Sequence, residues 1–163
     1  MKTVMLMLNI SITEQHCQLI EDNELVFEAQ VSTALNGVGE QKDSGCTPRG
    51  LHQIRACIGA GQPENTIFVG RRPTGKIYTD ELGQQFPERD WILTRILWLS
   101  GLELGRNRLE NVDTMQRYIY IHGCPDSLPM GEPLSHGCIR MRNKDLLALF
   151  ELVKAGTKVL IHE

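Results

Sequence analysis

Short apolar segments separated by polar residues dominate the first part of the chain. Residues 4–12 and 17–31 are rich in branched side chains, as strands are, and the longer segment is interrupted by polar residues 21–24. Asp22 and Asn23 tolerate the positive φ angles of a two-residue hairpin turn. The pattern therefore predicts strands linked by hairpins.

The middle of the chain alternates between strand-like segments and loops. Further strands are predicted at residues 51–58, 66–69 and 157–161. Residues 35–50 and 70–87 are rich in glycine, proline and polar residues, which indicates loops or irregular strand. Residues 90–99 fit either a helix or a strand, and the serine and glycines that follow favour a buried strand after Arg95.

Residues 144–155 have the spacing of an amphipathic helix. Asn143 is predicted as its N-cap, Asp145 favours the positive end of the helix dipole, and Gly156 suits the C-terminal end. The buried face would consist of Leu146, Leu149, Phe150 and Val153. Many short strands and one clear helix predict a mainly β fold, a sandwich or partly open barrel with the helix packed on it. A length of 163 residues suits one domain, residues 1–163.

Composition and charge exclude several classes of protein. With 17 basic and 20 acidic side chains the net charge is −3, so no nucleic-acid partner is expected. No apolar run approaches the roughly 20 residues that cross a bilayer, so no membrane association is expected. Five cysteines, an odd number, favour a reducing compartment over a disulfide framework. The N-terminal residues show no small-residue cleavage site, so we expect a cytoplasmic protein, with the periplasm as the alternative.

Residues 118–141 contain two of the five histidines and two of the five cysteines. The apolar run before His122 predicts a strand that holds the imidazole rigidly, and the following loop would return Cys138 to it. The pair would supply a general base and a thiol nucleophile, with His122 oriented by a backbone carbonyl near Gly123. Gly137 permits a tight turn, so the N–H groups of Gly137 and Cys138 would form an oxyanion hole.

Other interpretations of the same residues stay open. A nearby guanidinium and imidazole would favour the reactive thiolate of Cys138, but this thiol taken alone suits a buried structural role, and His122 suits a hydrogen-bonded core histidine. Two imidazoles and two thiolates also make a possible tetrahedral zinc set: His122, Cys124, His136 and Cys138. The His-x-Cys spacing is unusual for zinc, so we predict no metal.

The stretch SHGCIRM, residues 135–141, resembles the signature of the L,D-transpeptidase catalytic domain family (YkuD-like), which joins a strand-end His-Gly to Ser-His-Gly-Cys. The resemblance continues in order through VST at 31–33, TPRG at 47–50 and the closing helix and strand at 143–161. One departure is Cys124, where family members commonly have threonine. It raises the hypothesis that oxidation joins Cys124 to Cys138 in a disulfide and inactivates the protein.

The resemblance implies a cysteine acyl enzyme that acts on peptidoglycan stem peptides without a cofactor. Cys138 would attack the carbonyl between the L-centre of meso-diaminopimelate and the terminal D-alanine, while His122 takes the thiol proton. The other motif residues would shape the site, contribute to the oxyanion hole or bind substrate: Gly123, Ser135, His136, Gly137 and Arg140. For Arg140, contact with a substrate carboxylate, support of the loop and a surface salt bridge all stay open.

The expected location favours one acceptor over another. Enzymes that crosslink the wall need export, whereas a bacterial cytoplasmic protein would meet recycled peptides. We therefore expect an L,D-carboxypeptidase of murein recycling that trims stem tetrapeptides, free or as muropeptides, to tripeptides. The alternatives are an L,D-transpeptidase that crosslinks peptidoglycan or exchanges D-amino acids, and a non-enzymatic protein that binds zinc or stem peptides. The resemblance also implies a covalent β-lactam (carbapenem) adduct at Cys138.

Overall fold

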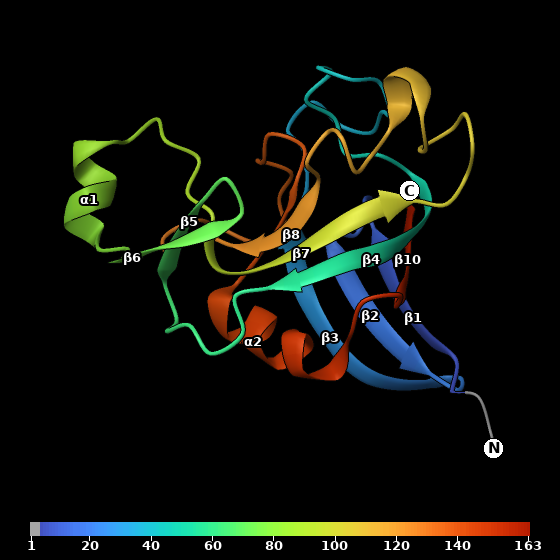
Figure 1. The fold of residues 1–163 in the computed structure, drawn as a ribbon, viewed down its shortest axis with the longest axis horizontal. Helices are drawn as coiled ribbons and strands as arrows, with labels where there is room; N and C mark the ends of the chain where they lie inside the picture. Colours follow the sequence, from blue (N-terminus) through green and yellow to red (C-terminus); the bar gives the residue numbers. More distant parts are fainter. Residues whose placement is uncertain (1–3) are drawn as a thin grey trace.

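The computed structural model describes residues 4–163, and residues 1–3 of the predicted domain 1–163 lie outside the described residues. The strands are β1 (Leu6–Ser11), β2 (His16–Glu21), β3 (Glu24–Ser32), β4 (Gly50–Ile58), β5 (Thr66–Val69), β6 (Arg72–Ile77), β7 (Leu93–Gly101), β8 (Tyr120–Gly123), β9 (Ile139–Met141) and β10 (Lys158–His162). The helices are α1 (Asp80–Gln85), α2 (Asn143–Leu152) and a 3₁₀ turn at Glu110–Val112. Figure 1 shows their arrangement.

Pairing between strands closes most of the sheet on itself. The order β4-β10-β1-β2-β3-β9-β8-β7 returns to its start because β7 also pairs with β4, so these eight strands of residues 4–163 form a ring. The strand β5 joins the beginning of β7 through the pair Ile67–Leu93, and β6 follows it. The prediction of a mainly β fold of sandwich or barrel type with a packed helix is confirmed.

A hydrophobic core fills the ring, and α2 packs against it. It contains fully buried side chains from most strands, including Leu8, Ile10, Leu19, Ile54, Leu97 and Ile161, together with Leu146 and Leu149 of α2. Around β8 and β9 the core residues are Ile119, Ile121, Ile139 and Met141. Because successive side chains of a strand point to opposite faces, the residues between them project away from this core: Tyr120, His122, Cys138 and Arg140.

The predicted hairpin is confirmed. Strands β2 and β3 pair in antiparallel fashion up to Glu21–Glu24, and the two turn residues have φ angles of 48° at Asp22 and 71° at Asn23. The ambiguous segment is a strand, as predicted, and it begins at Leu93, two residues before Arg95. These outcomes follow from local chemistry, because turn residues and branched side chains set the backbone directly.

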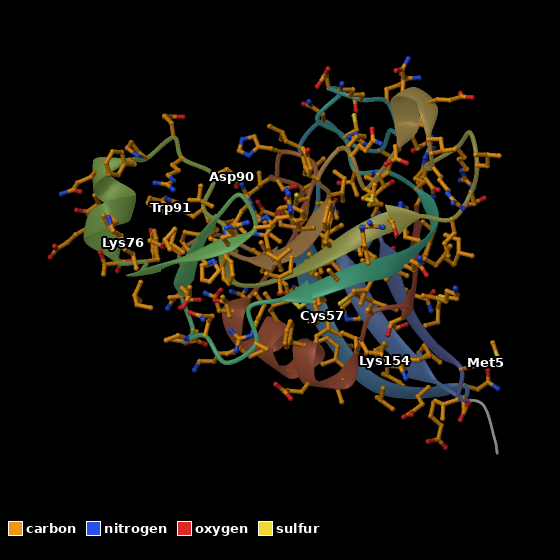
Figure 2. The ribbon with its side chains drawn as sticks, viewed as in Figure 1. Met5, Cys57, Lys76, Asp90, Trp91 and Lys154 are labelled. Carbon is orange, nitrogen blue, oxygen red and sulfur yellow. The ribbon has the colours of Figure 1, made fainter. Side chains whose placement is uncertain are left out.

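Residues 70–87, predicted as loop or irregular strand, contain the strand β6, whose pairing with β5 is irregular, and also the helix α1, which the pattern does not predict. Thr79 caps α1 by accepting the Leu82 N–H at 3.2 Å, and acidic residues occupy the first turn. No residue of α1 is buried. We call β5, β6 and α1 together the arm, which extends to one side of the ring (Figure 1). Asp90 and Trp91 lie where the chain leaves the arm (Figure 2).

The helix α2 corrects one prediction. Its N-cap position is Arg142, which makes no side-chain capping bond, and Asn143 is the first helical residue. The Asn143 side chain is buried and turns towards β7 and β8 instead of capping its own helix. No helix within residues 4–163 has the length and apolar character of a membrane span.

Candidate active site

His122 is held with one ring nitrogen bonded and the other free. It lies near the end of β8, is fully buried, and its Nδ1 is 2.6 Å from the Gly123 carbonyl oxygen. Since a carbonyl only accepts, Nδ1 carries the proton and Nε2 presents a lone pair. Nε2 has no hydrogen-bond partner among residues 4–163. The predicted orientation by a carbonyl near Gly123 agrees with this geometry.

Burial also favours the form of His122 that can accept a proton. Removal from water lowers the pKa of His122 below its ordinary value, against the opposing effects of the Asp90 charge and the Gly123 carbonyl. The imidazole is therefore neutral at pH 7. A neutral imidazole with a free Nε2 can act as a general base.

Cys138 lies just before β9, on the same face of the sheet as His122. The register pairs His122 with Arg140 and Ile121 with Ile139, which places Cys138 beside Tyr120. Its Sγ accepts the Tyr120 N–H at 3.3 Å and donates to the Tyr118 carbonyl at 3.4 Å. The thiol makes no hydrogen bond to the imidazole here, and such catalytic bonds often tighten only when substrate binds.

The protonation state of Cys138 differs from the sequence-based expectation. Burial of Sγ raises the pKa of the thiol to about 12, and the charges of Arg140 and Arg117 only partly offset this. The expectation that nearby cations favour the thiolate is therefore wrong for the substrate-free site. Cys138 is protonated at neutral pH, so a base has to remove its proton during attack.

Ser135 organises the turn that presents Cys138. Its hydroxyl donates to the Cys138 carbonyl at 2.5 Å and accepts the Gly137 N–H at 3.3 Å, and Thr47 donates to the Gly137 carbonyl at 2.9 Å. The φ of Gly137 is +131°, which side chains other than hydrogen rarely allow. The Gly137 N–H is thus bonded to Ser135 in the substrate-free site, and its role in the oxyanion hole stays a prediction. The Cys138 N–H is the other predicted donor.

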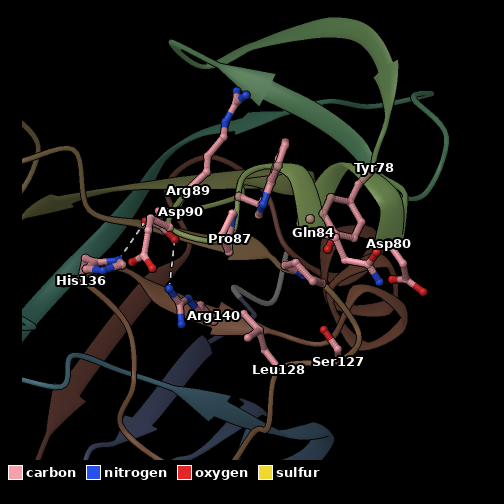
Figure 3. Close-up of a pocket in the computed structure, with 14 residues that line it drawn as sticks. Tyr78, Asp80, Gln84, Pro87, Arg89, Asp90, Ser127, Leu128, His136 and Arg140 are labelled. Carbon is pink, nitrogen blue, oxygen red and sulfur yellow. Dashed lines mark hydrogen bonds and ion pairs between the residues drawn. The ribbon is translucent and has the colours of Figure 1, made fainter.

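Asp90 joins Arg140 and His136 beside the site (Figure 3). Its carboxylate accepts from the Arg140 guanidinium at 3.0 Å and lies 3.5 Å from His136 Nδ1. Arg140 is buried, so its ion pair is not the surface salt bridge considered from the sequence. Burial alone would raise the pKa of Asp90, but His122, Arg140 and His136 hold it below its ordinary value. Sequence spacing could not reveal this contact, because 50 positions separate Asp90 from Arg140.

Two hollows meet at Asp90. The Cys138 cleft has a volume of about 540 Å³ and is lined by Cys138, Tyr120, Arg71, Arg117, Asp90 and His136, among others. The arm cavity has a volume of about 560 Å³ and lies between the arm and the ring (Figure 3). Asp90 and His136 line both hollows. The side chain of His136 is 70% exposed, so it is available to ligands rather than locked in the core.

Asn143 anchors the chain directly after His122. Its side-chain amide donates to the Cys124 carbonyl at 2.9 Å and to Asp126 at 3.2 Å. Gly123 makes this approach possible, because a Cβ at that position would collide with the Asn143 side chain and the Leu93 carbonyl. Gly123 therefore contributes its carbonyl to His122 and its lack of a side chain to the packing. Neither the amide contacts nor the collision is visible in the sequence.

Cys124 does not approach Cys138. Cys124 is buried and its Sγ is 3.8 Å from the Met141 carbonyl, whereas Cys138 lies beside Tyr120. Four strand positions span roughly 13 Å, well beyond the Cα separation of a disulfide. The hypothesis of a Cys124–Cys138 disulfide is therefore wrong for this fold. Within residues 4–163 no three His, Cys, Asp or Glu side chains are arranged to hold a metal ion, so the zinc alternative lacks its ligand set.

Comparison with known proteins agrees with this fold. Residues 7–161 match the model of the YkuD family, the L,D-transpeptidase catalytic domain, and the chain belongs to that family. "Probable L,D-transpeptidase YbiS" of Escherichia coli (strain K12) is 46% identical over 43 residues, which make up 26% of this chain and 14% of that protein. The chain therefore matches a small part of that relative's length.

Solved structures share the fold over nearly the whole chain. L,D-transpeptidase 3 from Mycobacterium tuberculosis, in complex with a faropenem-derived adduct, has a TM-score of 0.60 and 15% identity, covering 98% of this chain and 61% of that one. LD transpeptidase LdtMt1, in complex with imipenem, has a TM-score of 0.56 and 17% identity, covering 98% and 59%. At these identities the likeness concerns the fold.

Proposed function

We propose that the chain is a cysteine L,D-carboxypeptidase that removes the terminal D-alanine from peptidoglycan stem tetrapeptides in murein recycling. The observation that carries the proposal is the arrangement of His122 and Cys138 on one face of β8 and β9, with Nε2 of the histidine free. Membership of the L,D-transpeptidase family supplies the substrate class.

The first half of the reaction forms an acyl enzyme. Sγ of Cys138 attacks the carbonyl carbon of the L-centre of meso-diaminopimelate while Nε2 of His122 takes the thiol proton. The tetrahedral intermediate then collapses, the carbon–nitrogen bond breaks, and the imidazolium returns the proton to the departing amine of D-alanine. The Cys138 N–H would donate to the oxyanion. A thiol with a raised pKa suits this order, because its proton leaves only as the new bond forms.

The second half consumes water. A water molecule attacks the thioester carbonyl, His122 takes its proton, and the thiolate of Cys138 leaves and recovers that proton. The tripeptide departs with a new carboxylate. Support for water as the acceptor comes from the size of the Cys138 cleft, about 540 Å³, which falls in the range of pockets that enclose one small ligand. A single stem peptide would fill it.

Incubation with a meso-diaminopimelate tetrapeptide tests the proposal. We expect release of D-alanine and appearance of the tripeptide by mass spectrometry, abolished in Cys138→Ala and strongly reduced in His122→Gln. Cys57→Ala is the matched control, since Cys57 is a partly buried thiol on β4 outside the cleft. Absence of D-alanine release, or release that survives in Cys138→Ala, contradicts the proposal. Binding of the peptide without release would indicate a stem-peptide binding protein.

A transpeptidase is the second candidate, because the arm cavity adjoins the cleft and offers space for an acceptor peptide. Transfer to a second peptide or to a free D-amino acid would appear in the same reaction as a crosslinked or exchanged product. We also propose that the enzyme is located in the cytoplasm. Fractionation of the source cells is expected to place the enzyme in the cytoplasm with recycled peptides, and a periplasmic enzyme would favour transpeptidation.

A further inference from the structure

Arg71 occupies a turn position that arginine rarely takes. It is the second residue of the two-residue turn between β5 and β6, where Val69 pairs with Arg72 and the φ angles are 57° at Gly70 and 64° at Arg71. Positive φ at both central residues is the pattern of a type I′ turn, which favours asparagine or glycine. An arginine in this conformation points to a use for its side chain.

The side chain of Arg71 is fixed over the Cys138 cleft. Its guanidinium carbon lies 4.6 Å from the ring centre of Trp98 and 4.9 Å from that of Tyr118. Nη1 also donates to the Tyr120 hydroxyl at 3.2 Å. Stacking and hydrogen bonding of this kind hold the planar fork in one orientation and leave its other N–H groups available.

Arg71 is also a cation of the cleft that has no carboxylate partner among the described residues. Across residues 4–163, no Asp or Glu carboxylate lies within ion-pair distance of it, whereas Arg140 is paired with Asp90. The other arginine that lines the cleft, Arg117, donates to the carbonyls of Gly39, Glu40 and Cys46 and to the hydroxyl of Ser44. The free donors of Arg71 therefore suit an anionic group brought by the substrate.

Tyr120 sets the spacing between this cation and the thiol. Its backbone N–H contacts Sγ of Cys138, and its hydroxyl contacts Arg71. The guanidinium is thus about one tyrosine side chain away from the reacting sulfur. In a stem tetrapeptide, the carboxylate of the leaving D-alanine is close to the scissile bond. The carboxylate on the D-centre of meso-diaminopimelate lies at the far end of a side chain of comparable length.

We propose that Arg71 binds the D-centre carboxylate of meso-diaminopimelate and so selects this residue over lysine at the third position of the stem. The inference rests on the proposed function for its substrate. It makes Arg71 a residue that determines specificity, placed by the arm and not by the His-Gly-Cys motif.

Calorimetric binding to protein carrying Cys138→Ala tests the inference without turnover. Three tetrapeptides are compared: unmodified, amidated at the D-centre carboxylate, and amidated at the terminal D-alanine. The affinity of each peptide is measured for three proteins that all carry Cys138→Ala: one with no further change, one with Arg71→Gln, and one with Arg72→Gln as a neighbouring exposed control. A charge-assisted hydrogen bond predicts a loss of roughly 10- to 100-fold in affinity on D-centre amidation, and a similar loss for Arg71→Gln with the unmodified peptide. The two losses are not expected to add.

Several results would overturn the assignment. Equal weakening of all three peptides by Arg71→Gln would mean that Arg71 only holds the arm in place. If Arg71→Gln instead abolished the effect of amidating the terminal D-alanine, Arg71 would bind the leaving-group carboxylate. If the unmodified peptide showed no measurable binding, the inference would also be contradicted. D-alanine release by the unaltered enzyme is assayed separately, so failure of the proposed function is distinguished from failure of the role of Arg71.

Discussion

The hydroxyl of Thr94 donates a 2.6 Å hydrogen bond to the side-chain carbonyl of Asn143, joining β7 to the start of α2. Thr94 has a φ of +76°, a rare conformation for a branched residue, and it also accepts the Asn65 N–H at 3.0 Å. The Asn143 amide continues the network to the Cys124 carbonyl. A strained strand residue, a helix start and the segment after His122 are thereby fixed together.

Removal of the Asn143 amide should therefore be costly. We expect Asn143→Ala to lower the free energy of unfolding by about 1–3 kcal/mol, because buried partners lose their hydrogen bonds. Urea unfolding followed by fluorescence measures this. Asn36→Ala is the matched control, since Asn36 is exposed and its amide makes one bond, to Ser44. Equal stabilities of the two variants would contradict a structural role for the network.

The charge of Asp90 should be visible in the titration of His122. The anion favours the imidazolium, so Asp90→Asn is expected to lower the His122 pKa further below its ordinary value. The change is measured by NMR titration of the ring nitrogens, and the acid limb of kcat/KM should move to lower pH with it. Glu88→Gln, an exposed neighbour, should leave both unchanged. A shift to higher pH would mean that desolvation of His122, not the Asp90 charge, had changed.

Alkylation should report the protonated thiol directly. With a pKa of about 12, Cys138 is expected to react slowly with iodoacetamide at pH 7, and its rate should rise about tenfold for each pH unit up to pH 10. Peptide mass spectrometry follows the residue separately from the other cysteines. A rate that is already maximal near pH 7 would show a thiolate in the substrate-free enzyme.

His52 should make the fold sensitive to acid. It is buried between the Gly50 carbonyl at 3.0 Å and the Thr114 hydroxyl at 2.9 Å, and burial lowers its pKa from 6.5 to about 4. Between these values the unfolded chain binds a proton that the folded protein does not, so stability falls as pH falls from 6.5 to 4. The loss is of order 3 kcal/mol.

Denaturant unfolding at several pH values checks this dependence. His52→Gln should be less stable at neutral pH but should lose much of the slope between pH 6.5 and 4. His162→Gln, at an exposed histidine of β10, should keep the slope. An unchanged slope in His52→Gln would assign the acid sensitivity to other groups.

Carbapenems should acylate Cys138 if the proposed acyl enzyme forms. Opening of a strained lactam by the thiol releases no leaving group, so intact-protein mass should increase by the whole mass of imipenem. The adduct should be absent in Cys138→Ala and present in Cys57→Ala. Modification that persists in Cys138→Ala would move the reactive thiol elsewhere.

Local patterns predicted much of the fold because local interactions determine those elements. The Asp22–Asn23 turn follows from the conformational tolerance of two residues, and the apolar stripe of α2 follows from helical spacing. The helix α1 buries no residue, so it has no apolar stripe from which the sequence could predict it. Its signals were limited to the cap at Thr79 and two acidic residues.

The candidate site was predictable only as far as its motif extends. His122 and Cys138 stood out because their residue types and spacing suggest acyl transfer. Asp90 and Arg71 come from distant segments and reach the site through the arm and the start of β7, which no spacing encodes. Local rules favour a capping role for Asn143, but buried tertiary partners compete successfully for its amide.

The parallel pairing of β8 with β9 fixes the separation of base and nucleophile independently of the loop between them. Three register pairs, from Ile121–Ile139 to Gly123–Met141, hold the two strands. Residues 124–138 leave one strand and return to its neighbour, so their number does not set the distance from His122 to Cys138. Evolution can therefore lengthen or shorten this excursion, and with it reshape what the enzyme accepts, while the reacting pair keeps its place.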